Sequence, residues 1–317
     1  GGTGNASTDW DRTNYYQTYP SNELKLALWM ESERLLHPII DQKAVDTQNE
    51  VVKEEKKLRM DNAPYGKVIY GDVYKHLFDN HNYGRPMIGY IKDLDAATLD
   101  EFQDFYDKWY MPNNAVLVVA GDFKKTDAKT WIKDYFSPIP KRKETKRVII
   151  VEKERILEKR VKEYDANIQL PLLGMAYKTP SFKQRDAKIL DVISTVLSNG
   201  KSSRLYKKLV DDKKIALQAF SFSRPLEDYS VYIIGSILAG GTSADALIEE
   251  IDEEILKLQT ELISDDDLQK VRNQFENQFV AANSSVRGIA TSLARNYILG
   301  GDTNRINRNY SMPNKRN

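Results

Sequence analysis

The residues of this chain that could do chemistry are its three histidines and a group of glutamates on one predicted helix. The histidines are His37, His76 and His81, and no two of them have the spacing of three or four residues that places two imidazoles on one helix face. Cysteine is absent, which excludes thiolate metal sites, disulfides and thiol nucleophiles. The sequence also has no G-x-x-x-x-G-K-[ST] loop and no G-x-S-x-G elbow. A self-contained histidine metal site, phosphate loop or serine nucleophile is therefore not predicted.

The segment 42–59 has the pattern of an amphipathic helix with two polar residues on its apolar side. At about 100° per residue, the apolar stripe consists of Ala44, Val45, Val51, Val52 and Leu58. Gln48 and Glu55 fall within this stripe. A carboxylate directed at a protein core is costly unless it is paired or bound to a metal. Glu55 is therefore a candidate metal ligand, and an ion pair with Arg59 one turn later is the alternative that its position leaves open.

The first twenty residues combine a glycine-rich turn with strand-forming positions. Glycine stands at positions 1, 2 and 4, and Thr and Tyr predominate from 13 to 19, so two β segments are predicted. An edge strand leaves backbone groups free to bind an extended peptide. The candidate peptide-binding residues are Asn5, Ala6, Ser7 and Thr8, with an ordinary hairpin as the alternative.

Length and composition indicate a globular chain with room for two packed cores. It has 317 residues, of which 41% are hydrophobic and 29% charged. A formal net charge of +1 argues against a dedicated nucleic-acid binder. Apolar runs stay short of the ~20 residues that span a bilayer, and residues 1–20 lack the basic and apolar regions of a signal peptide. Neither a nucleic-acid partner nor a transmembrane segment is expected.

The strand and helix patterns predict two units of the α+β class, each a mostly antiparallel sheet with helices packed on it. We expect the first unit over 1–137, a charged linker over 138–165, the second unit over 166–301 and a tail over 302–317. Besides the opening hairpin, predicted strands cover 115–120, 148–151, 167–178, 215–223 and 230–239. Predicted helices cover 21–37, 41–62, 66–79, 98–110, 126–136, 182–198, 203–212, 243–262, 264–282 and 285–299.

Six short motifs follow one another in the first 122 residues. They are Gly-Gly-x-Gly-Asn-Ala-x-Thr at 1–8, Thr-Asn-Tyr-Tyr at 13–16, Glu-Ser-Glu-Arg-Leu at 31–35, Asn-Glu-Val-Val-Lys-Glu-Glu at 49–55, Tyr-Gly-Arg-Pro-Met-Ile-Gly at 83–89 and Tyr-Met-Pro-Asn-Asn-Ala-Val-Leu-Val-Val-Ala-Gly-Asp at 110–122. In this order they resemble the pitrilysin/insulysin (M16) family of zinc peptidases, which includes the mitochondrial processing peptidases. Residues 167–300 resemble the second, inactive repeat of that family. The resemblance implies a LuxS/MPP-like fold and a bacterial protein similar to the processing peptidases.

The resemblance implies a zinc site that lies only partly in this chain. The family binds zinc through a His-x-x-Glu-His helix, whose Glu is the general base, and through one Glu of a later helix. The motif match places that later ligand at Glu55, and Gln48 stands where many members carry a second, supporting Glu. In the family the His-x-x-Glu-His helix lies about seventy to eighty residues before the later Glu. Only 54 residues precede Glu55 here. Both histidines and the base are therefore expected upstream of Gly1, so residues 1–317 should hold no catalytic residue, and the complete protein should be a Zn2+-dependent metalloendopeptidase.

The resemblance also implies a peptide substrate and a partner. Family members bind a peptide as an added strand along the edge that here is Asn5 to Thr8. Substrate-binding halves carry an Arg and a Tyr at the positions of Val210 and Leu217. This chain therefore resembles the catalytic half of a two-half clamshell, whose Arg/Tyr pair comes from a partner half or subunit. Peptides or small unfolded proteins are the expected substrates, and a bacterial periplasm or envelope location is compatible with the resemblance.

Two alternatives remain open within the same fold. One is a non-catalytic scaffold subunit, in which Glu55 would serve only as the ion-pair partner of Arg59, and the other is a module that binds peptides without hydrolysis. His81 lies in the family-typical turn His-Asn-Tyr-Gly-Arg-Pro and is predicted to be structural. Metal binding at Glu55 and cleavage of bound peptides distinguish the three interpretations.

Overall fold

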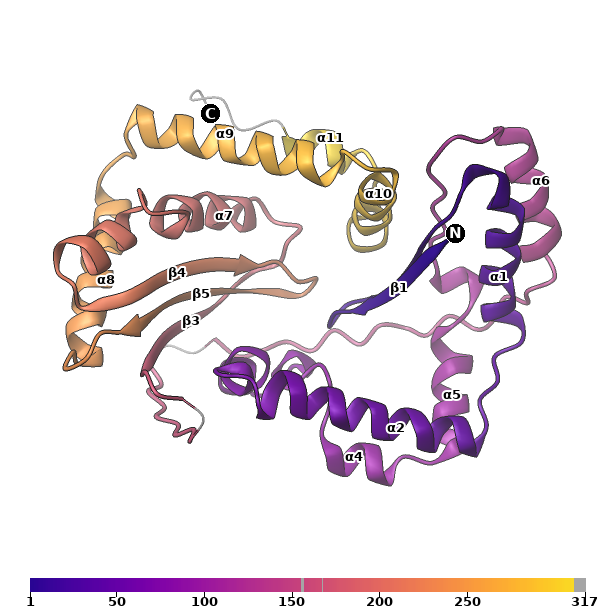
Figure 1. Cartoon of the computed structure of the whole chain (residues 1–317), viewed down its shortest axis with the longest axis horizontal. Helices are drawn as coiled ribbons and strands as arrows, with labels where there is room; N and C mark the ends of the chain where they lie inside the picture. Colours follow the sequence, from indigo (N-terminus) through magenta and orange to yellow (C-terminus); the bar gives the residue numbers. More distant parts are fainter. Residues whose placement is uncertain (155–156, 167, 311–317) are drawn as a thin grey trace. The chain divides into compact units, whose positions relative to one another are not determined.

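The computed structural model describes residues 1–154, 157–166 and 168–310, with side chains described up to residue 307. These residues form two compact units. Unit 1 comprises residues 1–55, 88–148 and the C-terminal residues from 277, and unit 2 comprises residues 56–87 and 149–276. Figure 1 labels the elements along the chain, from indigo at the N-terminus to yellow at the C-terminus. Each unit contains a small antiparallel sheet and several helices, which confirms the predicted α+β class.

Unit 1 contains the hairpin of β1 (Thr3–Thr8) and β2 (Thr13–Thr18). The strands pair antiparallel, and the connecting turn is closed by a hydrogen bond of 2.8 Å from the Asp9 N–H to the Arg12 carbonyl. The helices of this unit are η1 (Ser21–Glu23), α1 (Leu24–Leu36), α2 (Gln42–Lys56), α4 (Ile91–Ala96), α5 (Leu99–Trp109), η5 (Pro112–Asn114), α6 (Lys125–Phe136), α10 (Val286–Gly300) and α11 (Arg305–Tyr310). Helix α1 packs against α6, where Leu28 and Ala128 are buried.

The helix boundaries of unit 1 follow local capping chemistry. Thr98 and Glu101 form a capping box at the start of α5, in which the Thr98 N–H donates to the Glu101 carboxylate at 2.8 Å. This hydrogen bond holds the pKa of Glu101 below its ordinary value. The Ser285 hydroxyl caps α10 by accepting a hydrogen bond from the Gly288 N–H at 3.1 Å, and Gly301 ends that helix with a left-handed φ of 71°, a conformation that favours glycine.

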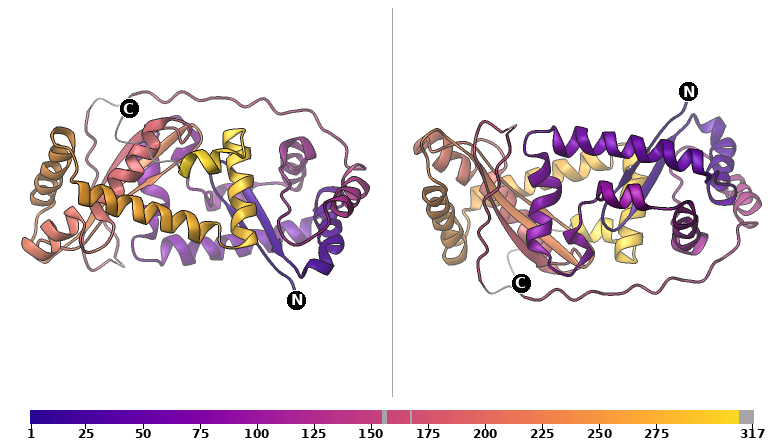
Figure 2. Two further views of the ribbon diagram at one scale, coloured as in Figure 1. Left: turned by 90° about the horizontal axis from the view of Figure 1, so that it is seen from above. Right: turned by 90° about the horizontal axis from the view of Figure 1, so that it is seen from below.

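Unit 2 contains a three-stranded antiparallel sheet with the order β3-β5-β4. Its strands are β3 (Leu172–Pro180), β4 (Ala216–Arg224) and β5 (Tyr229–Leu238). Its helices are η2 (Lys57–Asp61), η3 (Val68–Asp72), α3 (Val73–Leu77), η4 (Asn82–Gly84), α7 (Arg185–Ser198), η6 (Tyr206–Asp212), α8 (Ala244–Thr260) and most of α9 (Asp265–Ala282). Helix α7 packs against β3 and β4, and the views in Figure 2 show it alongside the sheet.

The core of unit 2 is apolar and tightly packed. Its fully buried members include Leu197, Leu205, Leu209, Ile234, Leu247 and Ile251, which come from α7, η6 and the segment before it, β5 and α8. The central strand β5 has a glycine where the neighbouring strand carries an aromatic ring. Gly235 lies opposite Phe220, and a Cβ at Gly235 would lie 2.3 Å from Phe220 Cζ. The close approach of the ring to this backbone therefore requires glycine.

Most predicted elements are present within a few residues of their expected limits, and two predicted strands are wrong. Residues 115–120 and 148–151 form no strand in the described part of the chain. The apolar run at 115–120 alternates between exposed and half-buried residues at its start. A strand requires a neighbouring backbone for its hydrogen bonds, and an apolar pattern alone does not supply one. The boundaries of the two sequence repeats stay a prediction.

Candidate functional site

The candidate peptide-binding residues Asn5, Ala6, Ser7 and Thr8 all lie in β1 and are exposed. In the described residues β1 pairs with β2 alone, so its other edge carries no strand. The Ala6 N–H donates to its neighbour Asn5 Oδ1 at 2.8 Å. A carbonyl of an added strand could replace this side-chain acceptor. Backbone hydrogen bonds of this kind bind extended peptides of many sequences.

A shallow hollow of about 290 Å³ lies beside this strand. Its lining residues are Gly4, Asn5, Ala6, Tyr15, Tyr16, Gln17 and Arg34. The guanidinium of Arg34, from α1, lies 4.7 Å from the centroid of the Tyr15 ring. Helix α1 thus places a cation over the hairpin on the side where the hollow opens.

Three tyrosines hold this hairpin to the helices of unit 1. The hydroxyls of Tyr15 and Tyr110 lie 2.8 Å apart, and the rings of Tyr106 and Tyr110 stack with centroids 4.9 Å apart. The Tyr106 hydroxyl donates to the Arg34 carbonyl at 2.5 Å. Burial, and then the hydrogen bond with Tyr110, raise the pKa of Tyr15 well above its ordinary value. The Tyr15 hydroxyl therefore stays neutral at physiological pH.

The local sequence pattern does not predict this tyrosine cluster. Tyr15 and Tyr110 are 95 residues apart, and helical or strand periodicity cannot reveal such a contact. The available signal was that Tyr15, Arg34 and Tyr110 each stand in one of the six motifs. Motifs that are far apart in sequence but meet in one cluster would have indicated a shared role.

Helix α2 carries the candidate ligand Glu55 and is anchored by its polar side. Lys53 Nζ lies 2.7 Å from Glu50 Oε1 and 2.5 Å from Asp95 Oδ1. The hydrogen bond with Asp95 has the larger effect on the pKa of Lys53, and together with the bond to Glu50 it raises this pKa to about 12. The Asn49 side-chain amide donates to the Leu94 carbonyl at 3.1 Å. These contacts fix the rotation of α2 against the segment that includes α4.

The environment of the apolar stripe on this helix differs from the prediction. Val45 is buried, but Val51 is 53% exposed and Leu58 is 71% exposed. Gln48 is exposed and Glu55 is half-buried. The expectation that Glu55 points into a closed core is therefore wrong for the described residues. Periodicity shows which side chains share a helix face, but it does not show what covers that face.

The three histidines are dispersed. His37 Nδ1 lies 2.8 Å from Glu33 Oε2 at an exposed position, and His76 Nε2 lies 3.5 Å from Glu163 Oε1. Within residues 1–154, 157–166 and 168–310, no group of three or more His, Asp or Glu residues is arranged to hold a metal ion. A zinc site needs three or four ligands, so the donor groups present do not make a complete one. Glu55 could supply one ligand.

His81 is buried in unit 2 and bound to an acidic partner. Its Nε2 lies 3.1 Å from Asp228 Oδ2, and the Tyr83 N–H donates to its Nδ1 at 3.2 Å. The nearby carboxylate of Glu152, which is 6% exposed, accepts backbone N–H bonds from Asp79, Asn80 and His81. These contacts join the turn before η4 to two distant segments, as expected for the predicted structural role.

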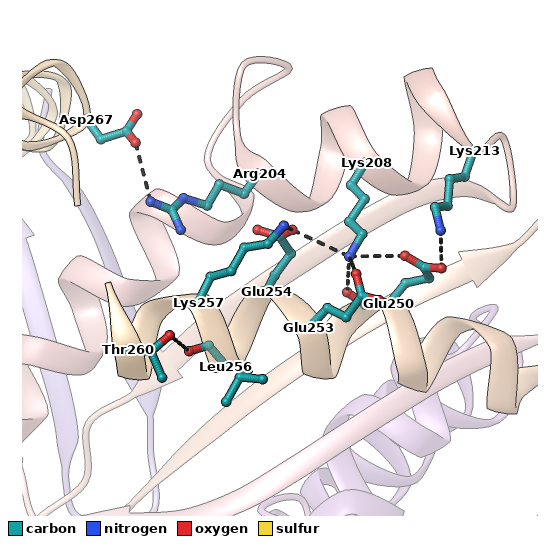
Figure 3. Close-up of polar contacts among 10 residues, drawn as sticks. All are labelled: Arg204, Lys208, Lys213, Glu250, Glu253, Glu254, Leu256, Lys257, Thr260 and Asp267. Atoms are coloured by element: carbon teal, nitrogen blue, oxygen red, sulfur yellow. Dashed lines mark hydrogen bonds and ion pairs between the residues drawn. The ribbon is translucent and has the colours of Figure 1, made fainter. Parts of the chain in front are cut away.

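Substrate-binding halves of the family carry an Arg and a Tyr at the positions that are Val210 and Leu217 here, which lie in η6 and on β4. Val210 is half-buried, and Leu217 is 54% exposed. A charged network of this region lies between η6 and α8, where Lys208 contacts Glu250, Glu253 and Glu254 (Figure 3). It joins oppositely charged side chains of two packed helices, which is a structural arrangement.

Within the described ranges, no helix has both the length and the hydropathy of a membrane span.

Comparison with known proteins accounts for nearly the whole chain. The model described as insulinase (peptidase family M16) matches residues 1–90, and the model described as the peptidase M16 inactive domain matches residues 96–275. The chain is 30% identical over 321 residues to the zinc protease PqqE of Helicobacter pylori, covering 95% of this chain and 69% of PqqE. These matches confirm the resemblance that the six motifs indicated.

Solved structures agree with this assignment. A protease from Helicobacter pylori has a TM-score of 0.86 with 27% identity, covering 99% of this chain and 77% of that chain. The first half of the periplasmic protease PqqL from Escherichia coli has a TM-score of 0.68 with 18% identity, covering 97% of this chain and 69% of that chain, and this likeness concerns the fold alone. The fold is thus that of a family whose members are named zinc proteases, and the chain belongs to peptidase family M16.

Proposed function

We propose that the chain is part of a zinc-dependent endopeptidase and that β1 holds the substrate as an added strand. The observation that carries this proposal is the exposed edge of β1, where residues 5–8 pair with a strand on one side only among the residues that the structure describes. The substrates are peptides or small unfolded proteins, because only an extended segment can pair with a strand edge. Tyr15, Arg34 and Tyr110 keep the hairpin in place by binding β2 to the helices of unit 1.

The second part of the proposal concerns Glu55 and Gln48. Glu55 supplies one carboxylate ligand for zinc, and Gln48 supports the site from the same side of α2. Bound zinc in such a site would activate a water molecule for attack on the peptide bond. No group of three or more His, Asp or Glu residues in the described part of the chain is arranged to hold a metal ion, so the two histidines and the general base would come from another segment or chain. We therefore propose that residues 1–317 alone do not hydrolyse peptides.

A partner half completes the substrate chamber in this proposal. Val210 and Leu217 have no polar side-chain atoms, so they cannot make the hydrogen bonds of an Arg/Tyr pair. An Arg and a Tyr that contact the bound peptide would come from a second half or subunit. The relative named as the first half of PqqL is compatible with such a division.

The test compares the chain with a longer protein in which a segment containing His-x-x-Glu-His is joined ahead of Gly1. Zinc binding is measured by isothermal titration, and hydrolysis is measured with a fluorogenic peptide. We expect neither tight zinc binding nor hydrolysis for residues 1–317, and both for the longer protein. In the longer protein Glu55→Gln should lower zinc affinity about 10- to 100-fold or more. Glu54→Gln, a neighbouring exposed position, is the matched control and should change little.

Two outcomes would contradict this assignment. Equal effects of Glu55→Gln and Glu54→Gln would show that Glu55 is not a ligand. Peptide binding without hydrolysis in the longer protein, with zinc bound, would support the non-hydrolytic module instead.

A further inference from the structure

The hollow beside β1 owes its shape to the two smallest residue types on one face of the hairpin. In an antiparallel pair, directly opposite residues project to the same face. Ala6 lies opposite Tyr15, and Gly4 lies opposite Gln17. No large side chain of β1 therefore separates the edge of the strand from the ring of Tyr15. Every second side chain of a strand added to that edge would project to this face.

The lining of the hollow includes an aromatic ring and a cation. The Arg34 guanidinium lies 4.7 Å from the Tyr15 ring centroid, and its side chain is 39% exposed. Its Nε lies 3.1 Å from Glu31 Oε2. The Gln17 side-chain amide also donates to the Glu31 carboxylate. The charge of the guanidinium is therefore already opposed along one edge, while the Arg34 and Tyr15 side chains both line the hollow.

The charges around the hollow disfavour a charged guest side chain of either sign. A guest carboxylate would have to compete with Glu31 for Arg34 and would be repelled by Glu31. A guest ammonium or guanidinium would face the like charge of Arg34. Tyr15 adds no charge because its hydroxyl stays neutral. Stacked guanidinium and aromatic groups bind planar side chains well.

We propose that this hollow, lined by Gly4, Ala6, Tyr15, Gln17 and Arg34, receives one uncharged aromatic side chain of a peptide that adds to β1. The inference rests on the proposed function, because it requires the peptide to bind as a strand. It assigns Arg34 and Tyr15 as specificity-determining residues, and it makes the small size of Ala6 a requirement for the preference.

The test uses the 317-residue chain and fluorescein-labelled ten-residue peptides with a Thr/Val/Ser sequence. One central position is Phe, Ala, Glu or Lys, and the dissociation constant is measured by fluorescence anisotropy. Because the other residues of the peptide are similar to one another, the peptide can pair with β1 in the register that places its variable side chain at the hollow. We expect the Phe peptide to bind about fivefold more tightly than the Ala peptide. Glu and Lys should give no gain over Ala.

Two variants of the hairpin provide a matched pair. Ala6→Leu fills the hollow and should bring the Phe peptide to within about twofold of the Ala peptide. Thr18→Leu adds apolar volume at an exposed position of β2, on the opposite face of the hairpin, and should leave the Phe preference intact. Equal affinities for all four peptides, a preference for Glu or Lys, or equal effects of the two variants would overturn the inference while leaving strand addition in place. Failure of every peptide to bind would overturn both.

Discussion

His81 Nε2 lies 3.1 Å from Asp228 Oδ2, in a pair that links two segments 147 residues apart. The Tyr83 N–H donates to His81 Nδ1, so the ring proton resides on Nε2 and points to the carboxylate. The imidazole also contacts the rings of Phe78, Tyr83 and Tyr229. A buried ring with both nitrogens bonded contributes to the stability of unit 2.

We predict that His81→Ala lowers the free energy of unfolding by about 2–4 kcal/mol, because it removes a buried ring and leaves polar groups without this partner. The matched control is His37→Ala. His37 also pairs with a carboxylate, Glu33, but its side chain is 70% exposed, so its loss should cost at most about 0.5 kcal/mol. Urea unfolding followed by circular dichroism measures both. Similar losses in the two variants would contradict the structural role of His81.

Glu152 gives the protein a specific dependence on acid. Burial raises the pKa of this carboxyl. Hydrogen bonds from the backbone N–H groups of Asp79, His81 and Asn80 lower the pKa, and together they outweigh the effect of burial, so the net pKa lies below the ordinary 4.5. A depressed pKa in the folded state contributes stability above the unfolded-state pKa. That contribution is lost as the pH falls through the folded-state value.

Glu152→Gln should therefore cost about 1–3 kcal/mol at pH 7. The difference in free energy of unfolding between Glu152→Gln and the unmodified protein should become smaller as the pH falls below about 4.5. Urea unfolding at pH 7, 5, 4 and 3 measures this, with Glu144→Gln at an exposed position as the control. A difference that stays constant over this pH range would show that the charge of Glu152 is not responsible.

Lys208 connects η6 to α8 through three carboxylates (Figure 3). Its Nζ lies 2.6 Å from Glu253 Oε2, 3.0 Å from Glu250 Oε2 and 3.5 Å from Glu254 Oε1. Glu254 is 5% exposed. Lys208→Met should destabilise the protein by about 1–3 kcal/mol, because the buried Glu254, the largely buried Glu250 and the exposed Glu253 lose a shared cation.

The control for Lys208→Met is Lys270→Met. Lys270 Nζ lies 3.6 Å from Asp267 Oδ1, and its side chain is 53% exposed, so its loss should cost at most about 0.5 kcal/mol. Thermal unfolding of both variants checks the prediction. If raising the salt concentration reduced both effects equally, the Lys208 network would behave as a surface ion pair.

The sequence could predict the elements better than their contacts. The limits of α7, β4 and β5 follow from local periodicity and turn residues, which act over a few positions. The strand at 115–120 was wrong because pairing depends on a neighbour elsewhere in the chain. The burial of Glu55 was overestimated for the same reason, since the side chains that cover α2 are not encoded in its own pattern.

The candidate site was predictable in part. The edge residues Asn5 to Thr8 were identified from a glycine-rich turn and a resemblance, and the structure places them in the exposed strand β1. The role of Arg34 could not be predicted, because a Glu-Ser-Glu-Arg-Leu helix gives no indication that its arginine stacks on a tyrosine of β2. Glu31, three residues earlier on the same helix, forms an i, i+3 ion pair with Arg34 in the structure.

The central claim is that β1 binds peptide by strand addition, and amide hydrogen exchange measured by NMR tests it most directly. With the ten-residue Phe peptide bound, we predict slower exchange at alternate residues of 3–8, because successive N–H groups of a strand point to opposite edges. The amides of α10 should not change, and a fully N-methylated peptide should neither bind nor protect β1. Unchanged exchange across 3–8 while the peptide is bound would contradict the claim.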